Sequence, residues 1–216
     1  MKEIKTKGNT LETGKLNELV EHTVSVILGE RNLGLKLDTG KVLVIDTEKS
    51  IVSKRSSFTD RKIEGTTREI KGRPSISLDV SPEQTSFAVG TLVAIVKDLA
   101  ERDGVKRDTY IGLEGNHMDS TGSGRFGDVN NSIENMELVD KNANSRHNCV
   151  QNKLIKLGIW IRFSAKDKEF MDWVLKRGFI MRQDISHLEV KLSRMYDTKT
   201  YILRREDENS PYEIIN

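Results

Sequence analysis

The sequence predicts an α+β fold, in which short strands and a few amphipathic helices follow one another along a chain of 216 residues. Three observations predict this class. Apolar residues recur at helical spacing in several stretches, short aliphatic runs lie between turns that contain Gly, Asn and Asp, and the sequence has no internal repeat. The length suits one large domain or two small ones.

The composition limits the classes of protein to which the chain can belong. Apolar residues make up 36% and charged residues 31%, so we expect a modest core beneath a heavily charged surface. The net charge is only +2, so an anionic partner must be argued from local basic clusters. The single cysteine, Cys149, excludes an internal disulfide and fits a reducing compartment. A signal peptide and a membrane span are both absent from the sequence pattern, which indicates a cytoplasmic protein with no membrane partner.

The N-terminal part is expected to contain one helix and two strands. Leucine, isoleucine and valine recur at helical spacing over residues 15–28, and Gly29 ends this pattern. Residues 41–45 (KVLVI) follow the turn residues 38–40 and predict a strand. Residues 76–80 alternate apolar and polar side chains, which is typical of a half-buried strand.

A second, longer helix is predicted for residues 82–102. Ser81 suits the N-cap, Pro82 the first helical position and Gln84 the reciprocal capping bond. Apolar side chains at helical spacing would form its buried face, and Gly104 would end it.

The central part combines two short strands, a polar loop and a third helix. Residues 109–113 predict the first strand, and residues 118–130 form a long loop with several glycines. Residues 136–139 (MELV) predict the second strand, and residues 142–157 have helical character. The order is therefore strand, loop, strand, helix.

The C-terminal part predicts a strand, a helix and a hairpin. Residues 159–163 form the strand, and Ser164 would cap a helix over residues 165–177. Residues 187–195 and 200–205 alternate apolar and polar side chains, which indicates a terminal β-hairpin.

The segment from residue 114 to residue 148 collects groups that phosphodiester cleavage needs: a base, a Lewis acid and a phosphate contact. His117 is a suitable base because the pKa of histidine lies near neutral pH. Asn144 and His147 are three residues apart and share a face of the predicted helix. Asparagine oxygens suit Mg²⁺ or Mn²⁺. A regular strand would direct Asn116 and His117 to opposite faces, so both can face one site only with a local twist.

These residues, taken in order, resemble the motif of the HNH nuclease family, and most closely that of its phage-type homing endonucleases. The matching positions are Asn116 with His117, Asp119, Asn130 with Asn131, Asn135 with Met136, and Asn144, with His147 following. The resemblance covers about residues 40–154 and is strongest over residues 116–147. It implies an α+β fold with a ββα-metal (HNH) core, an N-terminal sheet-and-helix region and a C-terminal αββ module.

The resemblance also implies a role for each matched residue. His117 would be the catalytic general base, and Asn135 would brace the loop and orient the base. Asn116 and Asn144 would hold one Mg²⁺ (or Mn²⁺) ion. The supporting positions would be Asp119, Asn131 and His147.

Contacts with DNA are expected from two parts of the chain. By the resemblance, Arg146 and His147 would touch phosphate. A local excess of basic residues adds four further DNA-contacting positions, which are Lys54, Arg55, Arg61 and Lys62.

The chain divides into four expected regions. Residues 1–37 form an N-terminal helical extension, and residues 38–108 form a DNA-contacting region of strands and a helix. Residues 109–157 form the HNH core. Residues 158–216 form the C-terminal αββ module, which is a candidate for DNA binding because of its basic excess.

The expected function is that of a metal-dependent endonuclease of the HNH type, which nicks or cleaves double-stranded DNA. The protein would act as a monomer or a homodimer in the cytoplasm of a bacterial host, and the resemblance implies a phage as its source. One base and one ion per chain make one strand break at a time, so a double-strand break needs a dimer or a second binding event.

Two departures from the family pattern keep other interpretations open. Gly90 and Thr91 stand where His-Arg is usual, and both predicted metal ligands are neutral. Asp119 or Asp128, in the loop, would have to supply the missing carboxylate. A non-catalytic DNA-binding protein with a degenerate HNH core would explain both departures. A structural or virion-associated protein is the third alternative.

Overall fold

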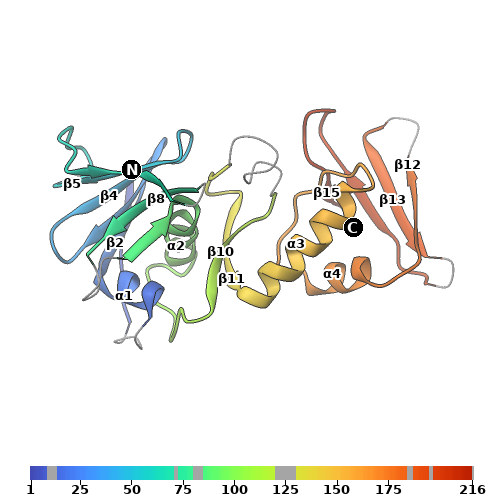
Figure 1. The fold of residues 1–216 in the computed structure, drawn as a ribbon, viewed down its shortest axis with the longest axis horizontal. Coiled ribbons are helices and arrows are strands. Elements are labelled where there is room, and N and C mark those ends of the chain that lie inside the picture. Colours follow the sequence, from blue (N-terminus) through green and yellow to red (C-terminus); the bar gives the residue numbers. More distant parts are fainter. Residues whose placement is uncertain are drawn as a thin grey trace. The chain divides into compact units, whose positions relative to one another are not determined.

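The chain has the α+β fold that the sequence predicts (Figure 1). The computed structural model describes residues 1–8, 14–70, 73–79, 85–119, 130–183, 187–194 and 197–215. Within these ranges the helices are α1 (Lys15–His22), α2 (Val89–Glu101), α3 (Lys141–Ile155) and α4 (Lys168–Leu175). None of the helices in the described ranges is long and apolar enough to cross a membrane.

The described residues form two compact units. Unit 1 comprises residues 1–117 and 130–140, and unit 2 comprises residues 118–119 and 141–215. The boundary between Asp140 and Lys141 lies inside the region 109–157 that the sequence predicts as one core.

Unit 1 is built from three antiparallel sheets and the helices α1 and α2. The largest has the order β1-β2-β3-β4-β5-β6, so each strand pairs with the strand that follows it. Its strands are β1 (Lys2–Lys5), β2 (Thr23–Leu28), β3 (Asn32–Leu37), β4 (Val42–Asp46), β5 (Ile51–Arg55) and β6 (Gly65–Thr66). The three-stranded sheet contains β7 (Arg68–Ile70), β8 (Arg73–Leu78) and β9 (Thr85–Ala88). The third is the hairpin of β10 (Leu113–His117) and β11 (Met136–Asp140).

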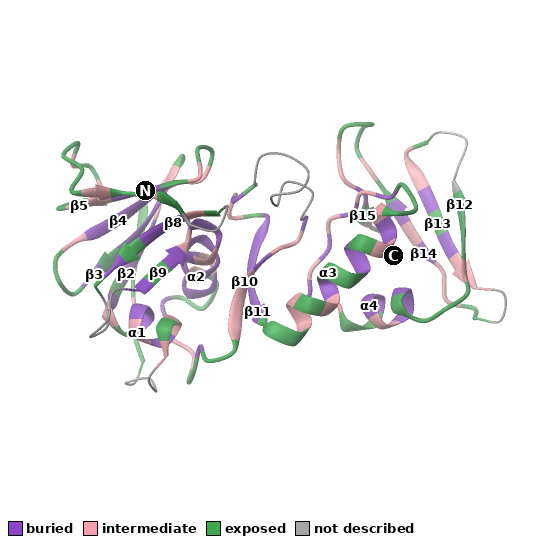
Figure 2. Cartoon of the chain, viewed as in Figure 1, coloured by how far each residue is buried: buried purple, intermediate pink, exposed green. Residues whose placement is uncertain are grey.

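Helix α2 lies at the centre of this unit. Nine of its thirteen residues are buried, and Figure 2 shows burial over most of its length. It packs against β10 and β11 and also against β2, β3, β8 and β9. A helix that is apolar on nearly all sides must be covered on nearly all sides. The core of unit 1 therefore forms around α2.

Three sequence predictions are corrected in unit 1. The helix predicted over residues 15–28 ends at His22, and the following residues form β2. β-Branched residues in TVSVIL suit a strand, and pairing with both β1 and β3 overrides the helical pattern. The helix predicted from residue 82 begins at Val89, because residues 85–88 pair with β8 as β9.

The predicted cap at Ser81, Pro82 and Gln84 lies outside the described residues. The third correction concerns the first central strand, predicted over residues 109–113. The strand is β10, and it ends at His117. His117 is therefore part of the paired strand and does not follow it.

Unit 2 packs α3 and α4 with the sheet β12-β13-β14-β15. Its strands are β12 (Phe179–Gln183), β13 (Glu189–Arg194), β14 (Tyr201–Arg204) and β15 (Glu213–Ile214). The predicted hairpin is present as β13 and β14. The strand predicted over residues 159–163 is reduced to a single bridge between Ile161 and Tyr212. Helix α4 is capped by Asp167, whose carboxylate accepts a bond from the Phe170 N–H, and not by Ser164.

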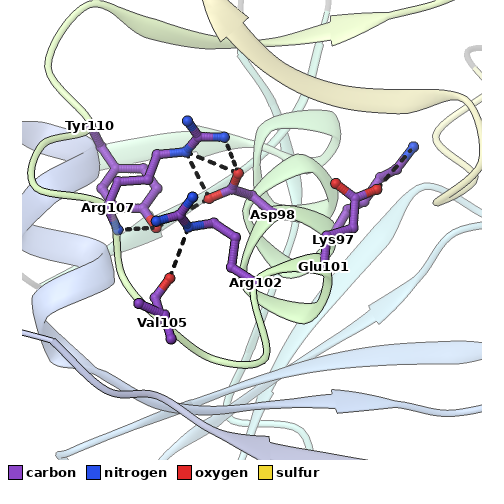
Figure 3. Close-up of polar contacts among 7 residues, drawn as sticks. All are labelled: Lys97, Asp98, Glu101, Arg102, Val105, Arg107 and Tyr110. Atoms are coloured by element: carbon purple, nitrogen blue, oxygen red, sulfur yellow. Dashed lines mark hydrogen bonds and ion pairs between the residues drawn. The ribbon is translucent and has the colours of Figure 1, made fainter.

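A buried polar cluster fixes the segment that leads from α2 to β10 (Figure 3). Asp98, on α2, is 5% exposed and accepts two bonds of 2.9 and 3.0 Å from Arg107 Nε, with a third contact from Nη2. Tyr110 Oη donates to Asp98 at 3.2 Å and accepts from the Arg107 N–H at 3.3 Å. The Tyr110 N–H donates to Asn17 Oδ1 at 2.5 Å. The chain is thus tied to both α2 and α1 just before it enters the hairpin.

Two groups of this cluster, Arg107 and Tyr110, have shifted pKa values. The hydrogen bond to Asp98 raises the pKa of Arg107, so the guanidinium keeps its charge. Burial raises the pKa of Tyr110 to about 12. The tyrosine is therefore a neutral hydrogen-bond donor in the folded protein at any ordinary pH.

The shifted pKa of Tyr110 predicts an alkaline loss of stability. The pKa is higher in the folded chain than the value of 10.0 for the unfolded chain, so the stabilisation is complete below pH 10 and is lost as pH rises towards about 12. This difference in pKa corresponds to a loss of about 2–3 kcal/mol in the free energy of unfolding. Denaturation of the wild type and of Tyr110→Phe across this range should show the added loss only in the wild type. Absorbance titration of the four tyrosines should lose its highest step in the variant. A step that persists would contradict the assignment.

Candidate functional site

The β10–β11 hairpin places the predicted base and one predicted metal ligand on opposite faces. Its register is regular, with Asn116 opposite Glu137 and His117 opposite Met136. Gly115 and His117 face α2, where each comes close to one of its first residues. Successive side chains alternate along a strand, so Asn116 and Glu137 lie on the other face. The local twist that would bring Asn116 and His117 to one face is absent from this strand pair.

Two glycines allow α2 and the hairpin to approach each other closely. A Cβ atom on Gly90 would lie 2.7 Å from Asn131 Oδ1, 3.0 Å from Met136 Cε and 3.3 Å from His117 Cε1. A Cβ atom on Gly115 would lie 2.8 Å from the Cα atom of Thr91. The distances of 2.7 Å and 2.8 Å are too short for a real Cβ atom. Gly90 stands where the family likeness leads us to expect histidine, and the space for that side chain is taken by Asn131 and His117.

His117 is held by a chain of hydrogen bonds that reaches the β4–β5 turn. Its Nε2 atom lies 2.9 Å from Asn131 Oδ1. Asn131 is 2% exposed, and its Nδ2 donates to Ser50 Oγ at 2.9 Å. Because an amide oxygen can only accept, Nε2 carries a proton, and in the neutral ring the lone pair is therefore on Nδ1. His117 is half-buried, and its ring is oriented by groups from two distant parts of the sequence.

Asn135 holds the loop that carries Asn131. The Asn135 side chain is buried, and its Nδ2 donates to the carbonyl of Asn130 at 2.9 Å. Its N–H donates to the carbonyl of Ser132 at 3.1 Å. These bonds tie both ends of a tight segment, with Asn131 between them. Asn135 therefore helps to position Asn131, and Asn131 in turn orients the His117 ring.

A buried carboxylate lies beside Asn116. Glu137 is 4% exposed, and its Oε1 accepts a bond of 2.9 Å from Asn116 Nδ2. A carboxylate and an amide oxygen are ligands that suit Mg²⁺ or Mn²⁺. Nδ2 and Oδ1 are different ends of the amide, so Asn116 can donate to Glu137 and still offer its oxygen. The sequence prediction missed Glu137, although a hairpin register that pairs it with Asn116 would have indicated it.

The other predicted residues of the central segment belong to unit 2. Asn144 Oδ1, on α3, accepts from Asn148 Nδ2 at 3.1 Å. Asp119 Oδ1 accepts from Trp160 Nε1 at 2.7 Å. Whether Asn144 meets Asn116 at one ion stays a prediction. Asp128, the other carboxylate suggested by the sequence, lies outside the described residues.

His147 and Arg146 have partners inside unit 2. His147 is fully buried, its Nε2 lies 2.8 Å from the carbonyl of Phe163, and the two rings are 4.2 Å apart. This placement differs from the expected phosphate contact, because a ring inside the core presents no nitrogen to a phosphate. Arg146, on the same helix, forms an ion pair with Asp172 of α4. A phosphate contact by Arg146 would have to share or replace that pair.

The four basic residues predicted to contact DNA in unit 1 lie on β5 and the loop after it. Arg55 donates to Ser53 Oγ at 2.8 Å and to the carbonyl of Asp60 at 2.9 Å, so part of its guanidinium binds the protein itself. Lys54 is half-buried on the same strand, whereas Arg61 and Lys62 are exposed. Arg61 and Lys62 are therefore the two that offer their full charge to solvent.

The comparisons with known proteins identify no relative of this chain. A scan against models of protein families finds no match, and searches of curated proteins and of solved structures find none either. The function is therefore argued from the residues and their geometry.

Gly90 lies against Asn131 and His117, so adding one methyl group at this position should disturb both side chains. Gly90→Ala should displace Asn131 or His117 and lower the free energy of unfolding by about 1–3 kcal/mol, as overpacking does. The ring signals of His117 should move in an NMR spectrum that contains only four histidines. Gly65→Ala is the matched control, because a Cβ atom there meets Lys54 Cβ at 3.9 Å, an ordinary contact. Unmoved His117 signals in Gly90→Ala would show that the close contact is not present.

Proposed function

We propose that this protein is a metal-dependent endonuclease that hydrolyses phosphodiester bonds in double-stranded DNA. The proposal takes β10, β11 and the following helix α3, in chain order, as a ββα-metal core of the HNH type. One observation carries it: a histidine on the first strand of the hairpin has its tautomer and orientation fixed by a buried asparagine. The motif order in the sequence supports the same assignment.

In this proposal His117 is the general base. Asn131 Oδ1 accepts a hydrogen bond from the Nε2–H group. The lone pair on Nδ1 of the neutral ring then takes a proton from the attacking water. The hydroxide that forms attacks phosphorus, the bond from phosphorus to the sugar oxygen breaks on the opposite side, and that oxygen takes a proton from solvent. Asn131 can keep its bond to Nε2–H when the ring becomes positively charged, which stabilises the protonated base.

Asn116 and Glu137 would hold the divalent ion on their side of the hairpin, and its joint action with His117 on one phosphate requires a local change of the strand pair when substrate binds. Asn116 offers an amide oxygen and Glu137 a buried carboxylate, and Asn144 stays the further ligand predicted from the sequence. When bound, Mg²⁺ or Mn²⁺ supplies Lewis-acid stabilisation of negative charge on the phosphate oxygens. Glu137 would supply the negative charge that a set of neutral asparagine ligands lacks.

A second candidate function is supported by the hairpin geometry. Asn116 and His117 face opposite sides of a regular strand pair, which favours a DNA-binding protein whose HNH core has lost its competent site. Such a protein would bind duplex DNA in a salt-dependent manner but would not cut it. The two candidates differ in one measurable property, which is metal-dependent strand breakage.

The base assignment predicts the outcome of a plasmid-nicking assay. His117→Ala should lower the Mg²⁺- or Mn²⁺-dependent nicking rate by about 100- to 10,000-fold, because general-base catalysis is lost. DNA binding, measured separately in EDTA, should stay as in the wild type. His22→Ala is the matched control, since the His22 side chain is 41% exposed and pairs with Asp38 at 2.8 Å. Nicking by His117→Ala at the wild-type rate would overturn the role of His117. A wild-type chain that binds DNA but never nicks it would support the second candidate.

A further inference from the structure

An open groove in unit 1 lies between the turn that joins β4 to β5 and the β7–β8 hairpin. Its volume is about 380 Å³, at the lower end of the range for ligand-binding pockets. Its lining residues are Lys49, Ser50, Ile51, Thr67, Arg68, Glu69 and Pro74. Because the groove is open, it suits part of an extended ligand better than an enclosed small molecule.

The charged side chains of the groove favour an anion. Lys49 and Arg68 supply two positive charges, and Glu69 supplies one negative charge. The Lys49 side chain is 72% exposed and lies 3.7 Å from Asp46 Oδ2, so this surface pair binds its ammonium only weakly. Arg68 is exposed at the start of β7. Both cations can therefore turn to a phosphate that enters the groove.

The uncharged lining completes the pattern of a sugar–phosphate chain. Thr67 offers a hydroxyl group, which commonly contacts phosphate and sugar oxygens, whereas the Ser50 hydroxyl is bonded to Asn131. Ile51, which is 40% exposed, and Pro74 offer apolar surface to the sugar carbons. The mixture of two cations, one hydroxyl and a small apolar area matches a nucleic-acid backbone, which repeats a charged phosphate and a less polar sugar.

The groove is linked to the proposed base by two hydrogen bonds. Ser50 lines the groove, and its Oγ accepts from Asn131 Nδ2 at 2.9 Å. The other end of the same amide lies 2.9 Å from His117 Nε2. Ser50 has a φ of 53°, a left-handed conformation that non-glycine residues rarely adopt. The turn is held by Asp46, whose carboxylate accepts from the Lys49 N–H at 2.9 Å. The groove wall and the histidine are thus fixed to one another.

We propose that this groove binds the sugar–phosphate backbone of the DNA strand beside the bond that is cut. Ser50 is then a positioning residue, because it ties the wall of the occupied groove to the base through Asn131. The inference rests on the proposed function, since it is there that His117 acts on DNA. It adds a substrate-binding site at Lys49 and Arg68.

The test compares two double variants with the same loss of charge. Lys49→Ala with Arg68→Ala removes both groove cations, whereas Lys2→Ala with Lys5→Ala removes two exposed lysines from β1, at the opposite edge of the six-stranded sheet from β5 and β6. Binding of a short DNA duplex is measured by fluorescence anisotropy in EDTA, at several salt concentrations. The groove variant should raise Kd by about tenfold or more and reduce the salt slope by about 2, one for each lost phosphate contact. The β1 variant should bind as the wild type does.

The outcomes separate the groove from the catalytic proposal. A groove variant that binds like the wild type, or a β1 variant that loses as much affinity, overturns the groove and leaves the nicking result standing. A wild type that binds through Lys49 and Arg68 but never nicks overturns the nuclease and leaves the groove standing. Preferential binding of a single-stranded RNA probe would overturn duplex DNA as the ligand.

Ser50→Ala tests the link between groove and base. The ring signals of His117 should shift, and kcat for nicking should fall while KM and the Kd for DNA stay unchanged. A groove residue that only supported the fold would lower both the stability and the affinity. Unshifted His117 signals together with unchanged kcat would overturn the positioning role of Ser50.

Discussion

The close approach of α2 to the β10–β11 hairpin is the constraint on which unit 1 depends. Gly90 and Gly115 supply no Cβ atoms at the contact, so backbone and side chains of the two elements meet directly. The space left beside Gly90 is filled by the Asn131 amide and the His117 ring. Protein interiors are close-packed, so a helix with any larger residue at position 90 would push these groups away. The position of the proposed base is therefore set by the absence of a side chain on its neighbour.

Polar groups inside unit 1 hold the segments that precede β10 and β11. Asp98 binds Arg107 and Tyr110 before β10, and Asn135 binds the carbonyl of Asn130 before β11. Buried polar groups that are fully paired specify one arrangement, because each alternative would leave a donor or acceptor unsatisfied. Each strand of the hairpin is consequently anchored just before its first residue. Loss of either set of hydrogen bonds would therefore shift His117, although neither set includes His117 itself.

Helix α3 shows how one residue pattern can suit two interpretations. His147, Val150, Gln151 and Leu154 follow the spacing of a buried helix face, and all four are buried in unit 2. The same histidine also falls at the position that the HNH motif assigns to phosphate contact. Packing supports the core interpretation, because the Phe163 ring covers the His147 ring and the Phe163 carbonyl binds His147 Nε2. The apolar residues that follow His147 at this spacing are the sequence signal that points to the core.

The sequence by itself determined the α+β class, the order of the central elements and the residues worth examining, because these depend on local spacing and on side-chain chemistry. It missed β2, β9 and the exact end of β10, since strand formation depends on partners far away in the chain. Only the tertiary structure placed Glu137 beside Asn116 and joined Ser50 to His117 through Asn131. Those relations arise from strand register and from contacts between segments as much as 81 residues apart, which no local pattern contains.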